Sequence, residues 1–254
     1  MTVRIMFPPL DWIIKLHRKG TLMNNERIYL LALIFGIMIM ISDKQNNIAQ
    51  AQNEKQINPA FAEVIDDPAL PRVLLIGDSI SIGYTVPVRE LLKGVANVHR
   101  IPENAGPTKN GVEHIGDWLG EGKWDVIHFN FGLHDLKIMD DGNHQVEIEA
   151  YATNLRKIIE SMHATGAKLI WANTTPVPKG ELKPLRKSGD DITYNAAAEN
   201  VMREFKIPIN DLYSFAMSLL DKIQIPSNVH FTAKGYELLG KQVANRIKKE
   251  WGKG

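Results

Sequence analysis

The stretch VLLIGDSISIGY, at positions 73–84, decides how this sequence is interpreted. An unbroken apolar run comes first and ends at Gly77, Asp78 and Ser79. Such a run is typical of a strand that is buried on both faces. We therefore expect a strand, a tight turn and then a helix, with Ser79 close to the point where the helix begins.

The same kind of apolar run recurs along the chain, which makes the fold class predictable. Further runs stand at positions 97–101, 125–131, 168–173 and 207–210. Between the runs, apolar residues recur at helical spacing, notably Val88, Leu91 and Leu92, then Leu155, Ile158, Ile159 and Met162. Strands that alternate with helices predict an α/β domain in which helices cover both faces of a parallel, five-stranded sheet.

The N-terminal segment differs from the rest of the chain. Arg27 precedes an uncharged apolar stretch at 28–41, and polar residues with the small-residue pattern Ala49-Gln50-Ala51 follow. This order is typical of a secretory signal peptide, so we expect residues 1–51 to direct export to the periplasm or the medium. The alternative is an uncleaved membrane anchor. The polar, proline-containing residues 52–71 are interpreted as a linker, and residues 72–254 as the folded domain.

Composition excludes several classes of function. The 254 residues carry a formal net charge of +1, which offers no electrostatic basis for binding nucleic acid. The chain has no cysteine, which excludes disulfides, zinc–thiolate sites and a cysteine nucleophile.

Polar residues follow each predicted strand. In a doubly wound sheet the ligand binds at the carboxyl ends of the strands, so these residues are candidates for a site. The sets are Gly-Asp-Ser at 77–79, Glu-Asn-Ala-Gly at 103–106, Gly-Leu-His-Asp at 132–135, Asn-Thr-Thr at 173–175 and, before the last helix, Ser-Asn-Val-His-Phe at 227–231.

Taken in this order, the motifs resemble those of the SGNH (GDSL-type) hydrolases, although Ser79 alone could simply cap a helix. The resemblance runs from about Arg72 to the last helix, and it implies a three-layer α/β/α fold with a flavodoxin-like sheet. It also implies that Ser79 is the nucleophile and His230 its base. The oxyanion hole would include the backbone N–H groups of Ser79 and Gly106. The family needs no metal or organic cofactor.

The third oxyanion donor is the first departure from the family pattern. His134 stands where the family has asparagine. An imidazole N–H can donate a hydrogen bond as an amide does, so His134 could complete the oxyanion hole. The alternative is a buried histidine bonded to a neighbouring loop. Asp78 and Asp135 are interpreted as residues that organise loops by accepting backbone N–H groups.

The acid of the catalytic triad is the second departure. The family usually has aspartate three residues before the histidine, and here that position is Ser227, followed by Asn228. Neither side chain can carry the negative charge that stabilises an imidazolium. A neutral side chain or a backbone carbonyl could orient His230, or a carboxylate could come from elsewhere, with Asp190 and Asp191 as candidates. A weakened or inactive enzyme is the third alternative.

These observations predict an exported serine esterase that acts on a small-molecule or polysaccharide ester, with an O-acetyl ester on carbohydrate preferred. Lysophospholipases and thioesterases belong to the same family and remain alternatives. A noncatalytic protein that binds a glycan or ester is a rival from another class, as is a metal-dependent hydrolase that uses His128 and His134. The oligomeric state stays open.

Overall fold

The computed structural model describes residues 58–252. The predicted signal peptide or anchor at 1–51 lies outside the described residues, as do residues 52–57 of the predicted linker. Within the described part of the chain, no helix is both long and apolar enough to cross a membrane.

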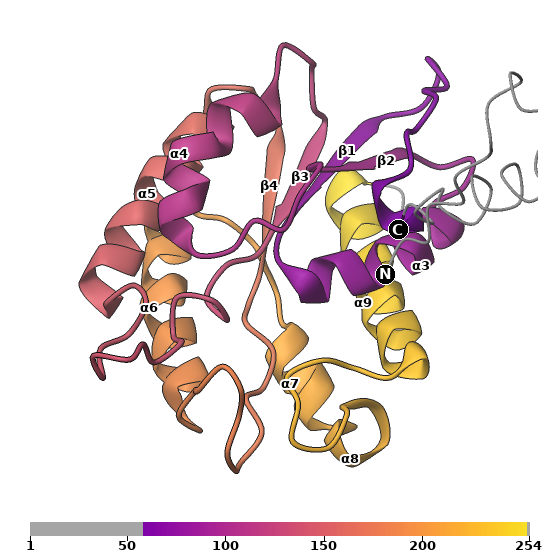
Figure 1. The fold of residues 1–254 in the computed structure, drawn as a ribbon. Coiled ribbons are helices and arrows are strands. Elements are labelled where there is room, and N and C mark those ends of the chain that lie inside the picture. Colours follow the sequence, from indigo (N-terminus) through magenta and orange to yellow (C-terminus); the bar gives the residue numbers. More distant parts are fainter. Residues whose placement is uncertain (1–57, 253–254) are drawn as a thin grey trace, which may run out of the picture. The chain divides into compact units, whose positions relative to one another are not determined.

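A five-stranded, all-parallel sheet forms the centre of the domain (Figure 1). Its order is β2-β1-β3-β4-β5, which is the flavodoxin-like order that the family resemblance implies. The strands are β1 (Arg72–Ile76), β2 (Asn97–Arg100), β3 (Val126–Phe129), β4 (Lys168–Ala172) and β5 (Ile209–Asn210). Val73 of β1 pairs with Val98 on one side and with Val126 on the other. The predicted parallel α/β architecture is therefore confirmed.

Helices cover both faces of this sheet, which gives three layers (Figure 1). One face carries α3 (Ser79–Leu91) and α9 (Ala233–Trp251). The other carries α4 (Thr108–Leu119), α5 (Ile148–His163) and α6 (Asp190–Glu204). Two short helices, α7 (Leu212–Met217) and α8 (Leu220–Ile223), connect β5 to α9, and a 3-10 turn, η1 (Pro59–Phe61), precedes β1.

The core follows the apolar periodicity closely. The α5 residues that share one predicted face, Leu155, Ile158, Ile159 and Met162, are all fully buried. The prediction for the end of α3 is wrong at one position, because Leu91 is 41% exposed while Val88 and Leu92 are buried. Leu91 is the last helical residue, and Leu92 leaves the helix as its C-cap and turns inward.

Two differences from the sequence-based elements concern the ends of two strands and one helix. The third strand ends at Phe129 and the fourth at Ala172, earlier than the apolar runs do, because the residues beyond them turn into loops. Helix α4 was not predicted, since it contains two glycines and few apolar residues. One of them, Gly111, packs so close to Phe131 and Ile158 that a Cβ atom would overlap their side chains.

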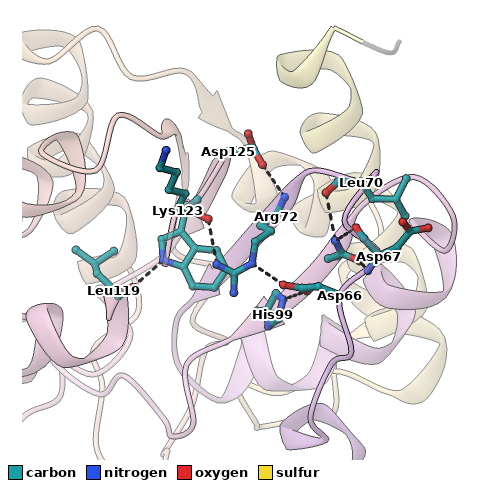
Figure 2. A network of polar contacts seen from close by, with 10 residues as sticks. Asp66, Asp67, Leu70, Arg72, His99, Leu119, Lys123 and Asp125 are labelled. Atoms are coloured by element: carbon teal, nitrogen blue, oxygen red, sulfur yellow. Dashed lines mark hydrogen bonds and ion pairs between the residues drawn. The ribbon is translucent and has the colours of Figure 1, made fainter. Parts of the chain in front are cut away.

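Residues 58–71 are attached to the domain, which corrects the predicted linker (Figure 2). The Asp66 carboxylate accepts a hydrogen bond from Arg72 Nε at 2.7 Å and contacts His99 Nε2 at 2.6 Å. The Asn97 side-chain amide donates to two backbone carbonyls of the same segment. Residues 58–71 therefore belong to the folded unit, because their polar groups find partners on the domain that the sequence does not reveal.

Candidate active site

The turn after β1 places the predicted nucleophile, Ser79, at the start of α3. Gly77 has no room for a side chain, since an added Cβ would lie 2.7 Å from the Cβ of Ser81. Asp78 is the N-cap of α3, and its carboxylate accepts the Ile80 N–H at 2.9 Å. Ser79 follows as the first helical residue, where backbone N–H groups have no acceptor within the helix. Its N–H is therefore suited to bind a negatively charged oxygen.

The predicted base, His230, lies directly beside this serine. His230 Nε2 is 2.9 Å from Ser79 Oγ. Two backbone hydrogen bonds hold the segment that carries the histidine: Ile225 N donates to His230 O at 3.0 Å, and Thr232 N donates to Ile223 O at 2.8 Å. The fold therefore brings the two residues together with the imidazole already at hydrogen-bond distance from the hydroxyl.

Asn228 determines which nitrogen of His230 carries the proton. Its side-chain oxygen accepts the backbone N–H of His230 at 3.0 Å, and because a backbone N–H can only donate, this atom is the oxygen. The same oxygen lies 2.7 Å from His230 Nδ1, which must therefore carry a hydrogen. Nε2 is left as an acceptor for the hydroxyl of Ser79. Ser227, the other candidate, adopts a left-handed backbone conformation (φ 53°) in the exposed turn before it.

The two carboxylates considered as remote triad acids have other partners. Asp190 contacts His144 Nε2 at 2.8 Å, and the buried Asp191 accepts the Val177 N–H at 2.8 Å. The hypothesis that one of them orients His230 is therefore wrong. Both stand at the start of α6, where carboxylates stabilise the helix and its adjoining loop.

The predicted oxyanion donor Gly106 lies in a loop that touches the nucleophile's turn. Ala105 N donates to the carbonyl of Gly77 at 3.2 Å, which ties the loop to that turn. Gly106 has a φ of 63°, and its N–H donates to the side-chain oxygen of Asn104 at 2.9 Å. A substrate oxyanion would have to share this N–H with the Asn104 side chain, or displace the Asn104 side chain from it.

His134 is half-buried, and its Nδ1 atom lies 3.0 Å from the Nζ atom of Lys137. Burial lowers the pKa of His134 to about 4. The positive charges of Lys137 and Arg186, and that of His230 when it is protonated, act in the same direction, and the Asp78 carboxylate opposes them. His134 is therefore a neutral imidazole at neutral pH, within electrostatic reach of both the nucleophile's turn and the base.

Asp135 connects the segment after β3 to the start of α4. One of its oxygens accepts the backbone N–H of Thr108 at 2.8 Å and the Thr108 hydroxyl at 2.5 Å. The other oxygen is buried without a partner among the described residues. Burial raises the pKa of Asp135 to about 6, although the hydrogen bonds from Thr108 oppose the shift. Its contacts are those of a residue that organises loops.

The polar residues after β4 hold the interior of the domain together. The Asn173 side chain donates to Asp211 at 2.8 Å, and the Thr174 hydroxyl donates to the Phe131 carbonyl at 3.0 Å. Together with Asp78, they line a small cavity at the carboxyl ends of the strands. The structure thus places them on the same cavity as Asp78, with these polar groups bonded to other parts of the protein.

His128, the second histidine of the metal hypothesis, is fully buried in β3. Its Nε2 atom lies 3.0 Å from the side-chain amide of Asn210, and burial lowers its pKa to about 3. Among residues 58–252, no three His, Asp or Glu side chains gather into a group that could hold a metal ion. The described part of the chain therefore offers no third ligand beside His128 and His134.

Sequence reasoning missed two cationic residues near His134. Lys137 stands three residues after it, which is the spacing of one turn and the only signal that could have revealed the contact. Arg186 comes from a distant loop: it is buried, and its Nε atom donates to the Leu133 carbonyl at 2.8 Å. Ile138 N also donates to the carbonyl of Leu185, so this loop packs against the segment that carries His134.

Comparison with known proteins agrees with this geometry. The model of the GDSL-like Lipase/Acylhydrolase family matches residues 75–238. A lipase/acylhydrolase from Enterococcus faecalis is similar in structure, with a TM-score of 0.61, 22% identity, and coverage of 71% of this chain and 96% of that one. No curated protein sequence matches.

Two esterases of known structure are also similar. For the acetylxylan esterase Axe2 from Geobacillus stearothermophilus, the TM-score is 0.58 at 17% identity, covering 71% of this chain and 95% of that one. For the acetyl xylan esterase AlAXEase, the TM-score is 0.60 at 13% identity, and the match covers 69% of this chain and 99% of that one. At these identities the likeness shows the shared fold.

Proposed function

The chain belongs to the GDSL-like lipase/acylhydrolase family, that of the SGNH hydrolases, and from this premise we propose that it is an exported serine esterase that removes O-acetyl groups from carbohydrate. Family membership supports an ester hydrolase. The observation that carries the mechanism is the 2.9 Å contact between Ser79 Oγ and His230 Nε2, with Nδ1 held by Asn228. The segment at 28–41 supports export.

In the first half of the reaction, Ser79 Oγ attacks the ester carbonyl carbon while His230 Nε2 takes the hydroxyl proton. The tetrahedral intermediate carries a negative oxygen, which the N–H groups of Ser79, Gly106 and His134 stabilise. The intermediate then collapses. The bond to the sugar oxygen breaks, His230 returns the proton to that oxygen, and the acetyl group remains on Ser79.

The second half repeats these roles with water as the nucleophile. His230 takes a proton from water, the resulting hydroxide attacks the acetyl carbonyl, and Ser79 Oγ leaves with the proton that His230 returns. In both halves the imidazolium donates its Nδ1–H to a neutral amide oxygen. Asparagine fills the same role in the Cys-His-Asn sites of papain-like proteases.

Two observations favour an acetylated sugar as the substrate. Polar side chains contact the predicted site residues, since the Asn228 side chain binds His230 and the Asn104 side chain accepts the N–H of Gly106, as suits a hydroxyl-rich ligand. Two of the structurally similar proteins are acetylxylan esterases. The substrate of this chain is proposed by analogy with them.

Hydrolysis of p-nitrophenyl acetate and of acetylated xylooligosaccharides tests the proposal. We expect Ser79→Ala and His230→Ala each to abolish turnover, with a loss on the order of 10³-fold or more, because neither residue functions without the other. Ser161→Ala is the matched control, since its hydroxyl bonds only within α5, to Lys157 O at 3.2 Å. A chelator should have no effect, and a loss of activity on chelation would instead favour the metal-dependent alternative.

The rival is a noncatalytic protein that binds an acylated glycan, motivated by the missing carboxylate at His230. A fluorophosphonate probe separates the two, because it reacts only with an activated serine. Stoichiometric labelling of Ser79 that requires His230 supports the esterase. Binding of acetylated xylooligosaccharide without labelling or turnover would support the rival.

A further inference from the structure

The contact between Lys137 and His134 lies within a single turn of chain. Leu136 N donates to Gly132 O at 3.0 Å, and Lys137 N donates to His134 O at 3.2 Å. This turn brings side chains three residues apart onto one side, and the Lys137 ammonium lies 3.0 Å from His134 Nδ1. The pair is therefore built by local backbone geometry.

The chemistry of the two groups determines the state of the imidazole. A lysine ammonium has three donors and no acceptor, so the ring nitrogen it contacts must present a lone pair. His134 Nδ1 is then unprotonated, and the single proton of the neutral ring sits on Nε2. This is the opposite tautomer to that of His230, whose Nδ1 carries the hydrogen.

The surroundings of His134 keep the ring neutral. Burial lowers its pKa to about 4, and Lys137, Arg186 and His230 add to the effect against Asp78. Arg186 stays in place because its Nε atom donates to the Leu133 carbonyl, directly before His134. At the neutral pH of the proposed reaction, His134 can therefore supply one N–H only, from Nε2.

We propose that Lys137 is a positioning residue, which fixes the Nε2–H tautomer of His134 so that this N–H serves as the third oxyanion donor in place of the family's asparagine. The inference rests on the proposed function. Asparagine always has an N–H to offer, whereas a free neutral imidazole divides its proton between two nitrogens. Lys137 removes that ambiguity, which explains how histidine can replace asparagine here.

The first test reads the tautomer directly by ¹⁵N NMR of the eight histidines, with the His134 signals assigned by their loss in His134→Ala. We expect His134 in the wild-type protein to show a protonated Nε2 and an unprotonated Nδ1. In Lys137→Met the two nitrogens should move towards averaged shifts, and the pKa of His134 should rise. Lys137→Arg keeps a donor and should restore the wild-type pattern in part, and Lys241→Met, on the exposed side of α9, is the control.

The second test is a double-mutant cycle on ester hydrolysis. His134→Ala should lower kcat by about 100-fold, the typical cost of one oxyanion donor. Lys137→Met should lower kcat less and leave KM unchanged, because the donor acts in the transition state. In the His134→Ala background, Lys137→Met should have no further effect.

The outcomes separate failure of this proposal from failure of the proposed function. An active esterase whose His134 tautomer is unchanged by Lys137→Met overturns the role of Lys137, as does an equal loss of kcat in both backgrounds. A protein that neither reacts with fluorophosphonate nor hydrolyses esters overturns the proposed function. If the His134 tautomer in that inactive protein still depends on Lys137, the result would support the positioning role of Lys137 without supporting the esterase function.

Discussion

At the scale of single residues, Asn228 shows how a serine–histidine pair can be oriented without a carboxylate. One amide oxygen binds both the backbone N–H and the Nδ1–H of His230, which fixes the ring and its tautomer. What it does not supply is negative charge, so in the proposed mechanism a neutral acceptor would hold the imidazolium of the transition state. Hydrogen bonds to charged acceptors are stronger than those to neutral ones.

We therefore expect Asn228→Asp to increase kcat. The carboxylate can accept the same two N–H groups while stabilising the imidazolium, and a gain of about 1 kcal/mol corresponds to roughly fivefold. Asn228→Ala should lower both kcat and the rate of fluorophosphonate labelling, since Nδ1 loses its acceptor. Steady-state kinetics on p-nitrophenyl acetate measure both effects. An aspartate variant slower than the alanine variant would contradict this account of Asn228.

At the scale of elements, the packing of α3 against α9 holds the proposed nucleophile and base together. Ser79 is the first residue of α3, and His230 lies three residues before the start of α9. The helices lie side by side on the same face of the sheet (Figure 1). Gly240 permits the close approach, since a Cβ there would lie 2.6 Å from the Cβ of Pro87.

Gly240→Ala should therefore destabilise the domain and impair catalysis. Overpacking typically costs about 1–3 kcal/mol, more than the helix propensity that alanine regains. Gly116→Ala in α4 is the matched control, because a Cβ there meets nothing within 4 Å. It should raise the free energy of unfolding by about 0.5–1 kcal/mol. Urea denaturation and kcat are the measurements, and equal effects of the two substitutions would exclude a special role for the α3–α9 contact.

The elements differ in how well they could be predicted from the sequence. The strands were predictable because unbroken apolar runs mark burial on both faces, and α5 because its apolar residues recur at helical spacing. Helix α4 escaped prediction because Gly111 is explained only by its neighbours Phe131 and Ile158, far away in the sequence. Motif order identified Ser79 and His230 as a candidate pair. The contacts of Arg186 and Asp190 depend on tertiary geometry. The three-residue spacing between His134 and Lys137 is a much weaker signal than the motif order.

At the scale of the whole molecule, buried ionisable groups couple stability to pH. His128 has an ordinary pKa of about 6.5 when unfolded and about 3 in the fold, because burial disfavours the charged ring. As the pH falls, His128 therefore becomes protonated at a higher pH in the unfolded chain than in the folded protein. The stability that His128 contributes is complete above pH ~6.5 and is lost progressively towards pH ~3. Asp135, whose pKa is raised to about 6, acts in the opposite direction below that pH.

Between pH 6 and 4, we expect the free energy of unfolding of His128→Gln to fall less steeply than that of the wild type. The difference between the two slopes of unfolding free energy against pH should approach about 1.4 kcal/mol per pH unit, the value for one proton. Only His128 has been removed, and Asp135 is common to both proteins. His163→Gln, at the exposed end of α5, is the control. Urea titrations at several pH values provide the slopes. Equal slopes for His128→Gln and the wild type would show that His128 does not couple folding to pH.

The distance along the chain between Ser79 and His230 has a consequence for synthesis. The two residues are 151 positions apart, one beside the first strand of the sheet and the other just before the last helix. A ribosome must therefore translate nearly the whole domain before the pair can meet, and closing so long a loop is among the later events of folding. In the proposed mechanism, a nascent or truncated chain that ends before His230 lacks the base, so we expect the appearance of hydrolytic activity to report that nearly the whole domain has been synthesised.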